Sequence, residues 1–320
     1  MKSAKALPYL FPVIIAGLLP IIFKGNEYFL HIYIVCIINI ILGSSLRAMA
    51  TTGQMSIGQA GFMAIGAYTS AILVTKFNFP VYGAFLMGGV AAMILAAVIG
   101  YPLARVKTIY FVMVTMFLGE IIRLFLFEWR SMTGGSTGMM GIPRIEILSA
   151  FGFSGTGWGE RFEICYFGLA LLIVVHLILY NIERSSLGRV FAAIGQDESV
   201  ASSVGINVAR HKVMIFCIGS FFTGLAGSFY AHYMTVLNPD TFGVFMSLYI
   251  LIYVAVGGKK FSGPIAGAIV LTLIPEIFGG LKQYQPLVFV LVLFIVVFLI
   301  PEGLAGLPEM IRSKFRKTKG

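Results

Sequence analysis

Charged residues are scarce in this chain of 320 residues. Asp, Glu, Lys and Arg together make up 11% of the sequence, whereas soluble globular domains carry about 25%. Hydrophobic residues make up 58%, and the mean hydropathy is +0.94. This composition excludes a soluble globular domain. We therefore expect an all-α polytopic integral membrane helix bundle, and the chain is long enough for about ten crossings of about 20 residues each.

Acidic residues are the rarer of the two charge types. The chain has 13 Asp and Glu against 23 Lys and Arg, which gives a net charge of +10. Such an excess attracts nucleic acid in a soluble protein, but here the cations lie between hydrophobic runs and at the C-terminus. In those places they act as topology signals. We therefore expect no nucleic acid partner.

Residues that build metal, redox or catalytic sites are few and scattered. Cys36, Cys165 and Cys217 lie singly in apolar segments, which indicates neither a disulfide framework nor a metal cluster. The four histidines form no i, i+4 pair, so we predict no metal and no cofactor. The chain also lacks a phosphate loop of the form Gly-x-x-x-x-Gly-Lys-Ser/Thr, a nucleophile elbow and an obvious acid/base pair. We expect neither an enzyme nor an ATPase site.

Hydrophobic runs are the dominant feature that is present. They predict ten spans, near 8–23, 28–46, 57–75, 80–104, 108–127, 162–182, 213–234, 241–256, 265–280 and 286–300. With these boundaries, the loops on one side carry 16 Lys and Arg, and the loops on the other side carry only six: Lys24, Lys76, Arg130, Arg144, Arg161 and Lys282. Because positive loops stay inside, we expect cytoplasmic N- and C-termini and a cytoplasmic segment 183–212.

Two of the predicted spans, near 57–75 and 265–280, are Gly-rich and short. The first follows an irregular stretch, 53–61, that places polar side chains where the backbone enters the bilayer. Irregular backbone at that depth is tolerated only where protein buries it or where it lines an aqueous cavity. We therefore predict that Gln54, Ser56, Gly58 and Gln59 lie on a substrate pathway. The alternative is that the glycines only let helices pack closely.

Another irregular stretch lies in the predicted outer loop 128–161. It begins with Thr133, Gly134 and Gly135 and extends to Pro143. Loops that join membrane spans run over the surface and can carry function. These three residues are candidates for the outer mouth of the pathway, and a flexible surface turn is an equally good interpretation.

The polar segment 183–212 contains the signals of a short capped helix. Asp197 is suited to the N-cap, Glu198 begins two turns of helix, and Gly205 and Ile206 fit the C′ and C″ positions of a Schellman end. We expect a cytoplasmic knob that contacts a soluble partner, with residues 185–189 as a polar link before it and residues 210–212 marking re-entry to the membrane. An ordinary solvated loop is the alternative.

Two further features involve charge. Glu120 and Arg123 lie at i, i+3 within one span, so we predict an intramembrane ion pair, with direct involvement in the pathway as the alternative.

The end of the chain, 301–320, is predicted to be a basic cytoplasmic tail. Apolar residues at helical spacing within it fit an interfacial helix held to anionic lipid, and a disordered tail is the alternative.

Several ordered motifs together resemble one known family. They are residues 53–68, 133–138, 188–189, 192–194, 205–207 with Lys212, and 257–258 with 263–264. Their order and composition are similar to the branched-chain amino acid permeases of bacterial ABC importers, of the LivM type. The resemblance implies one transmembrane permease domain, 1–320, in the inner membrane. It also implies a homologous second permease, two cytoplasmic ATPases and a periplasmic or extracellular binding protein.

The same resemblance implies a function and a coupling site. The chain would carry leucine, isoleucine or valine inward, with 183–212 as the loop that docks on the ATPase. The residues that match this loop are Gly188, Arg189, Asp197, Glu198, Ala201, Gly205, Ile206 and Asn207. The chain departs from the family where a basic residue commonly follows the Ala-Ile pair, because it has Gly195 and Gln196 there. Urea, short amides or a sugar as substrate, or a self-sufficient secondary transporter or channel, remain alternatives.

Overall fold

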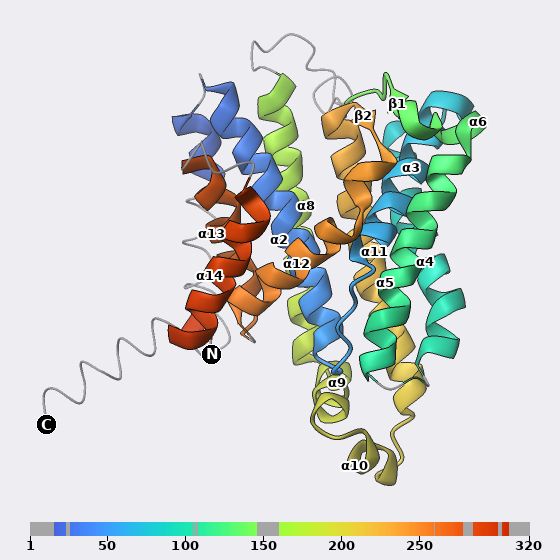
Figure 1. The fold of residues 1–320 in the computed structure, drawn as a ribbon, viewed down its shortest axis with the longest axis vertical. Helices are drawn as coiled ribbons and strands as arrows, with labels where there is room; N and C mark the ends of the chain where they lie inside the picture. The colour runs from blue at the N-terminus through green and yellow to red at the C-terminus, as the bar shows by residue number, and fades with distance from the viewer. Residues whose placement is uncertain are drawn as a thin grey trace, which may run out of the picture.

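The chain forms a bundle of membrane-spanning helices (Figure 1). The computed structural model describes residues 16–23, 26–104, 106, 108–145, 160–258, 260–277, 284–299 and 303–306. Six helices are long and apolar enough to cross a membrane: α2 (Glu27–Ala50), α3 (Gln59–Phe77), α4 (Val81–Leu103), α5 (Thr108–Glu128), α8 (Glu160–Arg184) and α11 (Val208–Met234). Three shorter apolar helices are α12 (Val244–Gly257), α13 (Gly263–Ile277) and α14 (Gln285–Leu299). The protein is thus an all-α, multi-pass membrane protein.

Most of the expected spans coincide with these helices. Of the first expected span, 8–23, only residues 16–23 are described, and residues 16–22 are helical. The span expected to be short at 57–75 is a full-length helix, α3. Of the expected basic tail 301–320, only residues 303–306 are described. They include the 3-10 turn η5 (Leu304–Gly306), and the rest of the tail lies outside the described residues.

Two helix starts differ from expectation because of local capping. α11 begins at Val208, before the expected span 213–234, so residues 210–212 lie in its first turns. The side chain of Asn207 caps this helix by accepting a hydrogen bond from the Arg210 N–H at 3.1 Å. α12 follows the 3-10 turn η3 (Pro239–Phe242), which Asn238 caps in the same way. A span running unbroken from 241 was therefore wrong.

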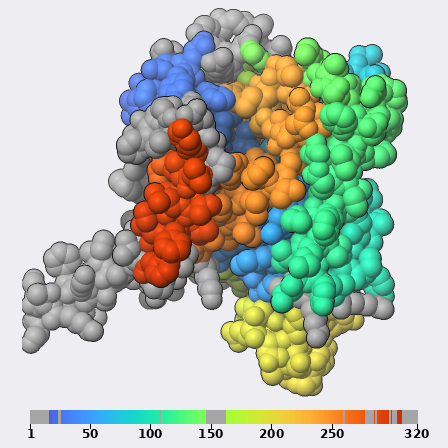
Figure 2. Space-filling view, viewed as in Figure 1, coloured from blue at the N-terminus to red at the C-terminus, as the bar shows by residue number. Residues whose placement is uncertain are grey.

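The predicted polar link at 185–189 is also wrong, because these residues begin a helix. α9 (Ser186–Gln196) is followed directly by α10 (Glu198–Ser203). Ser185 caps α9, and Phe191 and Ile194, three residues apart, form its buried apolar face. Figures 1 and 2 show α9 and α10 as a lobe that projects from one end of the bundle. We call α9 and α10 the appendage.

The opposite end of the bundle is closed by short elements. These are α6 (Arg130–Thr133), η2 (Gly135–Thr137) and an antiparallel ladder of two residues a strand, β1 (Met139–Met140) with β2 (Val236–Leu237). Lys76, at the end of α3, donates a hydrogen bond to the carbonyl of Ser131 at 2.8 Å. The two ends of α3 therefore face different surroundings, the appendage side and this capped end.

The tightest packing in the bundle joins α3, α4 and α11. A Cβ atom placed on Gly66 of α3 would lie 2.5 Å from the Cα atom of Gly224 on α11, so the two main chains touch. Ser228 donates a hydrogen bond to the carbonyl of Gly66 at 3.1 Å, and Ser70 lies 2.8 Å from His232. Small residues permit such close approach in lipid, where van der Waals packing and hydrogen bonds hold helices together. α4 packs against both α3 and α11, so the three form one closely packed group.

We expect Gly66→Ala to destabilise the protein. The added methyl group must separate α3 from α11, and overpacking of this kind costs about 1–3 kcal/mol in unfolding free energy. Thermal unfolding in detergent, followed by intrinsic fluorescence, measures the change. Gly17→Ala is the matched control, because a Cβ atom there meets only Leu169 Cδ2 at 3.9 Å. Equal melting temperatures for the two variants would contradict the proposed main-chain contact.

Candidate translocation and docking site

Residues 51–58 join α2 to α3 without forming a helix. Gln54 and Ser56 in this stretch are buried, as is Gln59 at the start of α3. The irregular backbone expected from the glycine pattern is therefore present, and buried residues alternate in it with the exposed Gly53 and Met55. We call residues 51–58 the irregular segment.

Neighbouring helices supply partners for the main chain at this junction. Ile57 donates its N–H to the hydroxyl of Thr115 on α5 at 3.3 Å, and Ala60 donates to the hydroxyl of Ser247 on α12 at 3.0 Å. Within the segment, Gly58 donates to the hydroxyl of Ser56 at 3.2 Å. Side-chain hydroxyls thus replace the hydrogen bonds that a continuous helix would have provided.

The two glutamines in this region have different environments. Gln59 lies between two helices: its Nε2 is 3.0 Å from Met49 Sδ on α2, and its Oε1 accepts a hydrogen bond from Thr223 on α11 at 2.8 Å. Gln54 is buried, and its Oε1 has no hydrogen-bond partner among the described residues. Gln59 therefore bridges two helices, whereas Gln54 keeps an acceptor unused.

Thr133, Gly134 and Gly135 lie at the capped end of the bundle, away from the irregular segment. Thr133 is buried, and its hydroxyl lies 2.6 Å from the carbonyl oxygen of Leu126. Both glycines have positive φ, 77° and 58°, which suits a tight turn. Since Gln59 and Lys76 lie at opposite ends of α3, about 25 Å apart at 1.5 Å per residue, the structure does not bring the two groups of candidate residues together.

The short helix α10 has the caps that the sequence predicts. Asp197 Oδ1 accepts hydrogen bonds from the N–H groups of Ser199 and Val200 at 2.7 and 3.1 Å. Gly205 has φ +86°, and the Ile206 N–H donates to the carbonyl of Ala201 at 3.2 Å, which completes a Schellman end. Ala201 is buried. The local shape of this helix is therefore set by its caps.

Two features of α10 were not foreseen from the sequence. Lys212 on α11 forms an ion pair with Glu198, with 2.6 Å between Nζ and Oε1. The Lys212 side chain is only 3% exposed, and that of Glu198 is 49% exposed. In addition, Val200 and Val204 are 62% and 72% exposed, so α10 presents apolar side chains on its outer surface. The ion pair holds α10 to α11, and the two valines face away from the protein.

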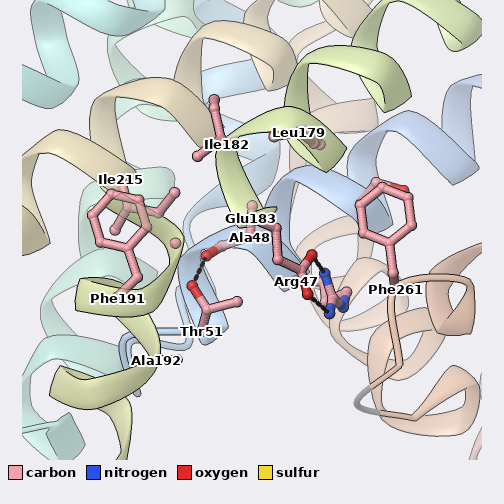
Figure 3. Close-up of a pocket in the computed structure, with 12 residues that line it drawn as sticks. Arg47, Ala48, Thr51, Leu179, Ile182, Glu183, Phe191, Ala192, Ile215 and Phe261 are labelled. Carbon is pink, nitrogen blue, oxygen red and sulfur yellow. Dashed lines mark hydrogen bonds and ion pairs between the residues drawn. The ribbon is translucent and has the colours of Figure 1, made fainter. Parts of the chain in front are cut away.

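The end of α8, which leads into the appendage, is tied to α2. Arg47, near the end of α2, makes a bidentate ion pair with Glu183 at 2.7 and 2.8 Å, just before α9 begins (Figure 3). Its guanidinium also lies 5.3 Å from the ring centre of Phe261. Gly188 is buried with its Cα against the backbone of Glu183, whereas Arg189 is exposed. Of the eight residues that match the family's coupling loop, five are exposed: Arg189, Asp197, Glu198, Gly205 and Asn207.

A cavity of about 70 Å³ lies between α9 and the bundle. Figure 3 shows Phe191 and Ile215 on one side of it and the Arg47–Glu183 pair on the other. Most of its lining is apolar, and the two charged groups in its wall neutralise each other. α9 is therefore incompletely packed on this side.

Glu120 and Arg123 form the ion pair that their spacing predicts, with 2.6 Å between Oε1 and Nη2. Arg123 also pairs with Asp240 of η3 at 2.7 Å, which the sequence analysis did not foresee. Because Asp240 lies far along the chain, no local spacing indicated it. The three charges tie α5 to the turn that precedes α12.

Three residues that hold the junction of the irregular segment and α3 were not predicted from the sequence: Thr115, Thr223 and Ser247. The only signal was that each is a hydroxyl residue inside an apolar span, where polar side chains bond between helices. As for cofactors, the part of the chain that the structure describes contains no group of three or more His, Cys, Asp or Glu that could hold a metal ion.

Comparison with known proteins identifies related transport proteins. A family model described as "Branched-chain amino acid transport system / permease component" matches residues 28–301. The LivM permease protein of the high-affinity branched-chain amino acid transport system of Escherichia coli K12 is 30% identical over 304 residues, which are 88% of this chain and 70% of that protein. No solved structure matches the chain significantly.

Two further relatives match smaller parts. The LivH permease protein of the Escherichia coli K12 branched-chain system is 30% identical over 148 residues, 44% of this chain and 46% of that protein. The ribose import permease protein RbsC of Haemophilus influenzae is 26% identical over 195 residues, 61% of this chain and 55% of that protein. All three relatives are permease proteins of import or transport systems.

We expect Glu198→Gln to loosen α10, because the variant leaves the buried Lys212 ammonium without its charged partner. Since Glu198 is half exposed, the cost is about 1 kcal/mol, which is modest for an ion pair. Limited proteolysis within 197–206 measures the opening of this helix. The double variant Glu198→Gln/Lys212→Met removes the unpaired charge and is expected to be cleaved more slowly than the single variant. Wild-type cleavage rates in both variants would show that the pair does not hold α10.

Proposed function

This chain belongs to the family of branched-chain amino acid transport system permease components, and we propose that it moves leucine, isoleucine or valine inward across the bacterial inner membrane. The observation that carries this proposal is the family match over residues 28–301, together with the 30% identity to the LivM protein over most of both chains. The nine apolar helices found among the described residues suit a membrane-embedded permease.

The energy for transport would come from partner subunits. In this proposal, the chain pairs with a homologous second permease, two cytoplasmic ATPases hydrolyse ATP, and a binding protein delivers the amino acid from outside. The similarity to both LivM and LivH supports a pair of related permeases. The missing phosphate loop in the sequence supports an ATPase site on other subunits.

The appendage is the proposed docking site for an ATPase. It projects from the bundle, and its α10 helix exposes Val200 and Val204. Exposed apolar residues on a cytoplasmic projection favour burial against a partner. The caps of α10 and the Lys212–Glu198 ion pair fix its shape beforehand, so docking costs little conformational entropy. Residues 183–212, which contain the appendage, would form the coupling loop.

The irregular segment is the proposed substrate pathway, with Gln54, Ser56 and Gly58, followed by Gln59. The unused acceptor of buried Gln54 supports this assignment, because buried polar atoms normally have partners. Gln59 is engaged by Met49 and Thr223, so the pathway would open here only when α2 and α11 move apart. Thr133, Gly134 and Gly135, at the opposite end of α3, are proposed to border the outer mouth.

A sugar is the second candidate substrate, because the ribose import permease matches 61% of this chain. A secondary transporter that couples to protons is less well supported. Its coupling would need an available carboxylate within the membrane, but Glu120 and Asp240 are both bound by Arg123. We propose that these three charges have a structural role.

We predict that Gly205→Val uncouples ATP hydrolysis from transport. Gly205 has φ +86°, and a β-branched residue in this left-handed region costs about 1–2 kcal/mol, so the end of α10 should deform. Uptake into proteoliposomes and ATP hydrolysis are measured on the same reconstituted complex, and co-purification measures assembly. Uptake at the wild-type rate would contradict the proposed docking role of α10.

We also predict that Gln59→Leu impairs uptake while the ATPases remain associated, with a similar loss for Gln54→Leu. Thr223→Val is the matched control, because it removes the hydrogen bond to Gln59 and leaves the amide in place. A pathway role predicts a larger loss of uptake for Gln59→Leu than for Thr223→Val. Equal losses would mean that Gln59 only joins α2 to α11, and normal uptake in both glutamine variants would exclude them from the pathway.

A further inference from the structure

α9 and the end of α8 that leads into it contact the end of α2 at two points. Glu183, in the last turn of α8, pairs with Arg47, and Gly195, near the end of α9, contacts Thr51. Arg47 and Thr51 lie four residues apart, so they are on the same side of the helix end. Thr51 also begins the irregular segment.

The second contact joins main chain to main chain. A Cβ atom on Gly195 would collide with the carbonyl oxygen of Thr51 and would lie 3.1 Å from its carbonyl carbon and 3.5 Å from the Gly53 nitrogen. No residue with a side chain fits this position without moving α9 away from the segment. The absence of a side chain at 195 is therefore what allows α9 to rest on the irregular segment.

Such a contact transmits displacement more directly than a contact between side chains. A long side chain can change rotamer and absorb a small movement, whereas two main chains in van der Waals contact must move together or separate. Asp197, which caps α10, lies two residues beyond Gly195. On the other side, Thr51 and Gly53 lead directly to Gln54. The contact thus lies between the proposed docking helix and the proposed pathway.

The cavity beside α9 gives this helix room to tilt. It lies between the bundle and α9, with Arg47, Glu183 and Thr51 among its lining residues (Figure 3). Atoms that face a void lack packing partners, so a tilt of α9 toward the cavity loses few contacts. The Arg47–Glu183 pair stays at one edge, and Gly195 moves with the other end of α9.

We propose that Gly195 is a positioning residue that passes movement of α10 to the irregular segment. This inference rests on the proposed function, in which an ATPase drives α10. Close packing of Gly195 on Thr51 and Gly53 makes segment 51–58 follow α9, so that nucleotide-driven movement reaches Gln54 and Gln59.

The first test is Gly195→Ala in the reconstituted complex with its ATPase and binding-protein partners. The variant has a higher helix propensity than the wild type, but α9 must shift away from Thr51. We expect assembly and ATP hydrolysis to persist, and the number of amino acids transported per ATP to fall by at least about fivefold, the lower end of ordinary coupling between sites. Ser186→Ala is the control, because it also raises helix propensity in α9, at an exposed position away from Thr51.

The second test follows the irregular segment itself. Met55 is 46% exposed, so Met55→Cys can be labelled with a maleimide, and the parent with its three native cysteines gives the background rate. In the wild-type complex, the labelling rate is expected to differ between the ATP-bound and nucleotide-free states. Gly195→Ala should abolish this difference. If Gly195→Ala fails to assemble, the labelling rate of Met55→Cys in the complex with Gly195 intact decides whether the irregular segment responds to nucleotide.

The outcomes separate the inference from the function on which it rests. Two results would overturn the role of Gly195 while leaving the importer function intact. One is a Gly195→Ala complex that transports as many amino acids per ATP as the wild type, and the other is a Met55→Cys labelling rate that is the same with and without ATP. A wild-type complex that shows no ATP-driven uptake would overturn the proposed function, and the inference with it.

Discussion

Inside a membrane, main-chain N–H and C=O groups must find partners within the protein, and this requirement organises the junction between α2 and α3. Residues 51–58 leave the helical conformation at a buried position, so their hydrogen bonds must come from elsewhere. Hydroxyls on α5 and α12, those of Thr115 and Ser247, accept two of the N–H groups. Four helices therefore meet at this one break in the helical backbone, and Thr223 of α11 completes the set through Gln59.

The rest of the bundle divides around this junction. On one side, α3, α4 and α11 are held by direct main-chain contact at Gly66 and Gly224 and by hydrogen bonds of Ser228 and His232. On the other side, α2 packs against α8, α12 and α13, and it also packs against α11, where the two groups of helices meet. Two groups of helices that meet along α2 and α11 and at an irregular, polar segment suit a permease, because relative movement of two packed groups can change access to a site between them.

Features that depend on neighbouring residues could be predicted from the sequence. The caps of α10 follow from Asp197, Gly205 and Ile206, and the Glu120–Arg123 pair follows from helical spacing. Features that depend on distant residues could not. The sequence predicts a polar link at 185–189 and not the start of α9, because the apolar face of this helix consists of little more than Phe191 and Ile194, and their burial depends on the bundle beneath them. Likewise, no spacing rule connects Lys212 with Glu198 or Arg123 with Asp240.

The long-range ion pairs give the appendage a defined mechanical connection. Lys212 of α11 is paired with Glu198 of α10, and Arg47 of α2 is paired with Glu183 in the last turn of α8, directly before α9. Gly195 of α9 also contacts Thr51 at the end of α2. Both cations are largely buried, but their carboxylate partners are partly exposed, so each pair contributes modestly to stability. The appendage thus links the same two helices that Gln59 bridges through Met49 and Thr223. Any movement of the appendage that separates α2 from α11 must therefore break one of the two Gln59 contacts, which frees a polar side chain beside the irregular segment.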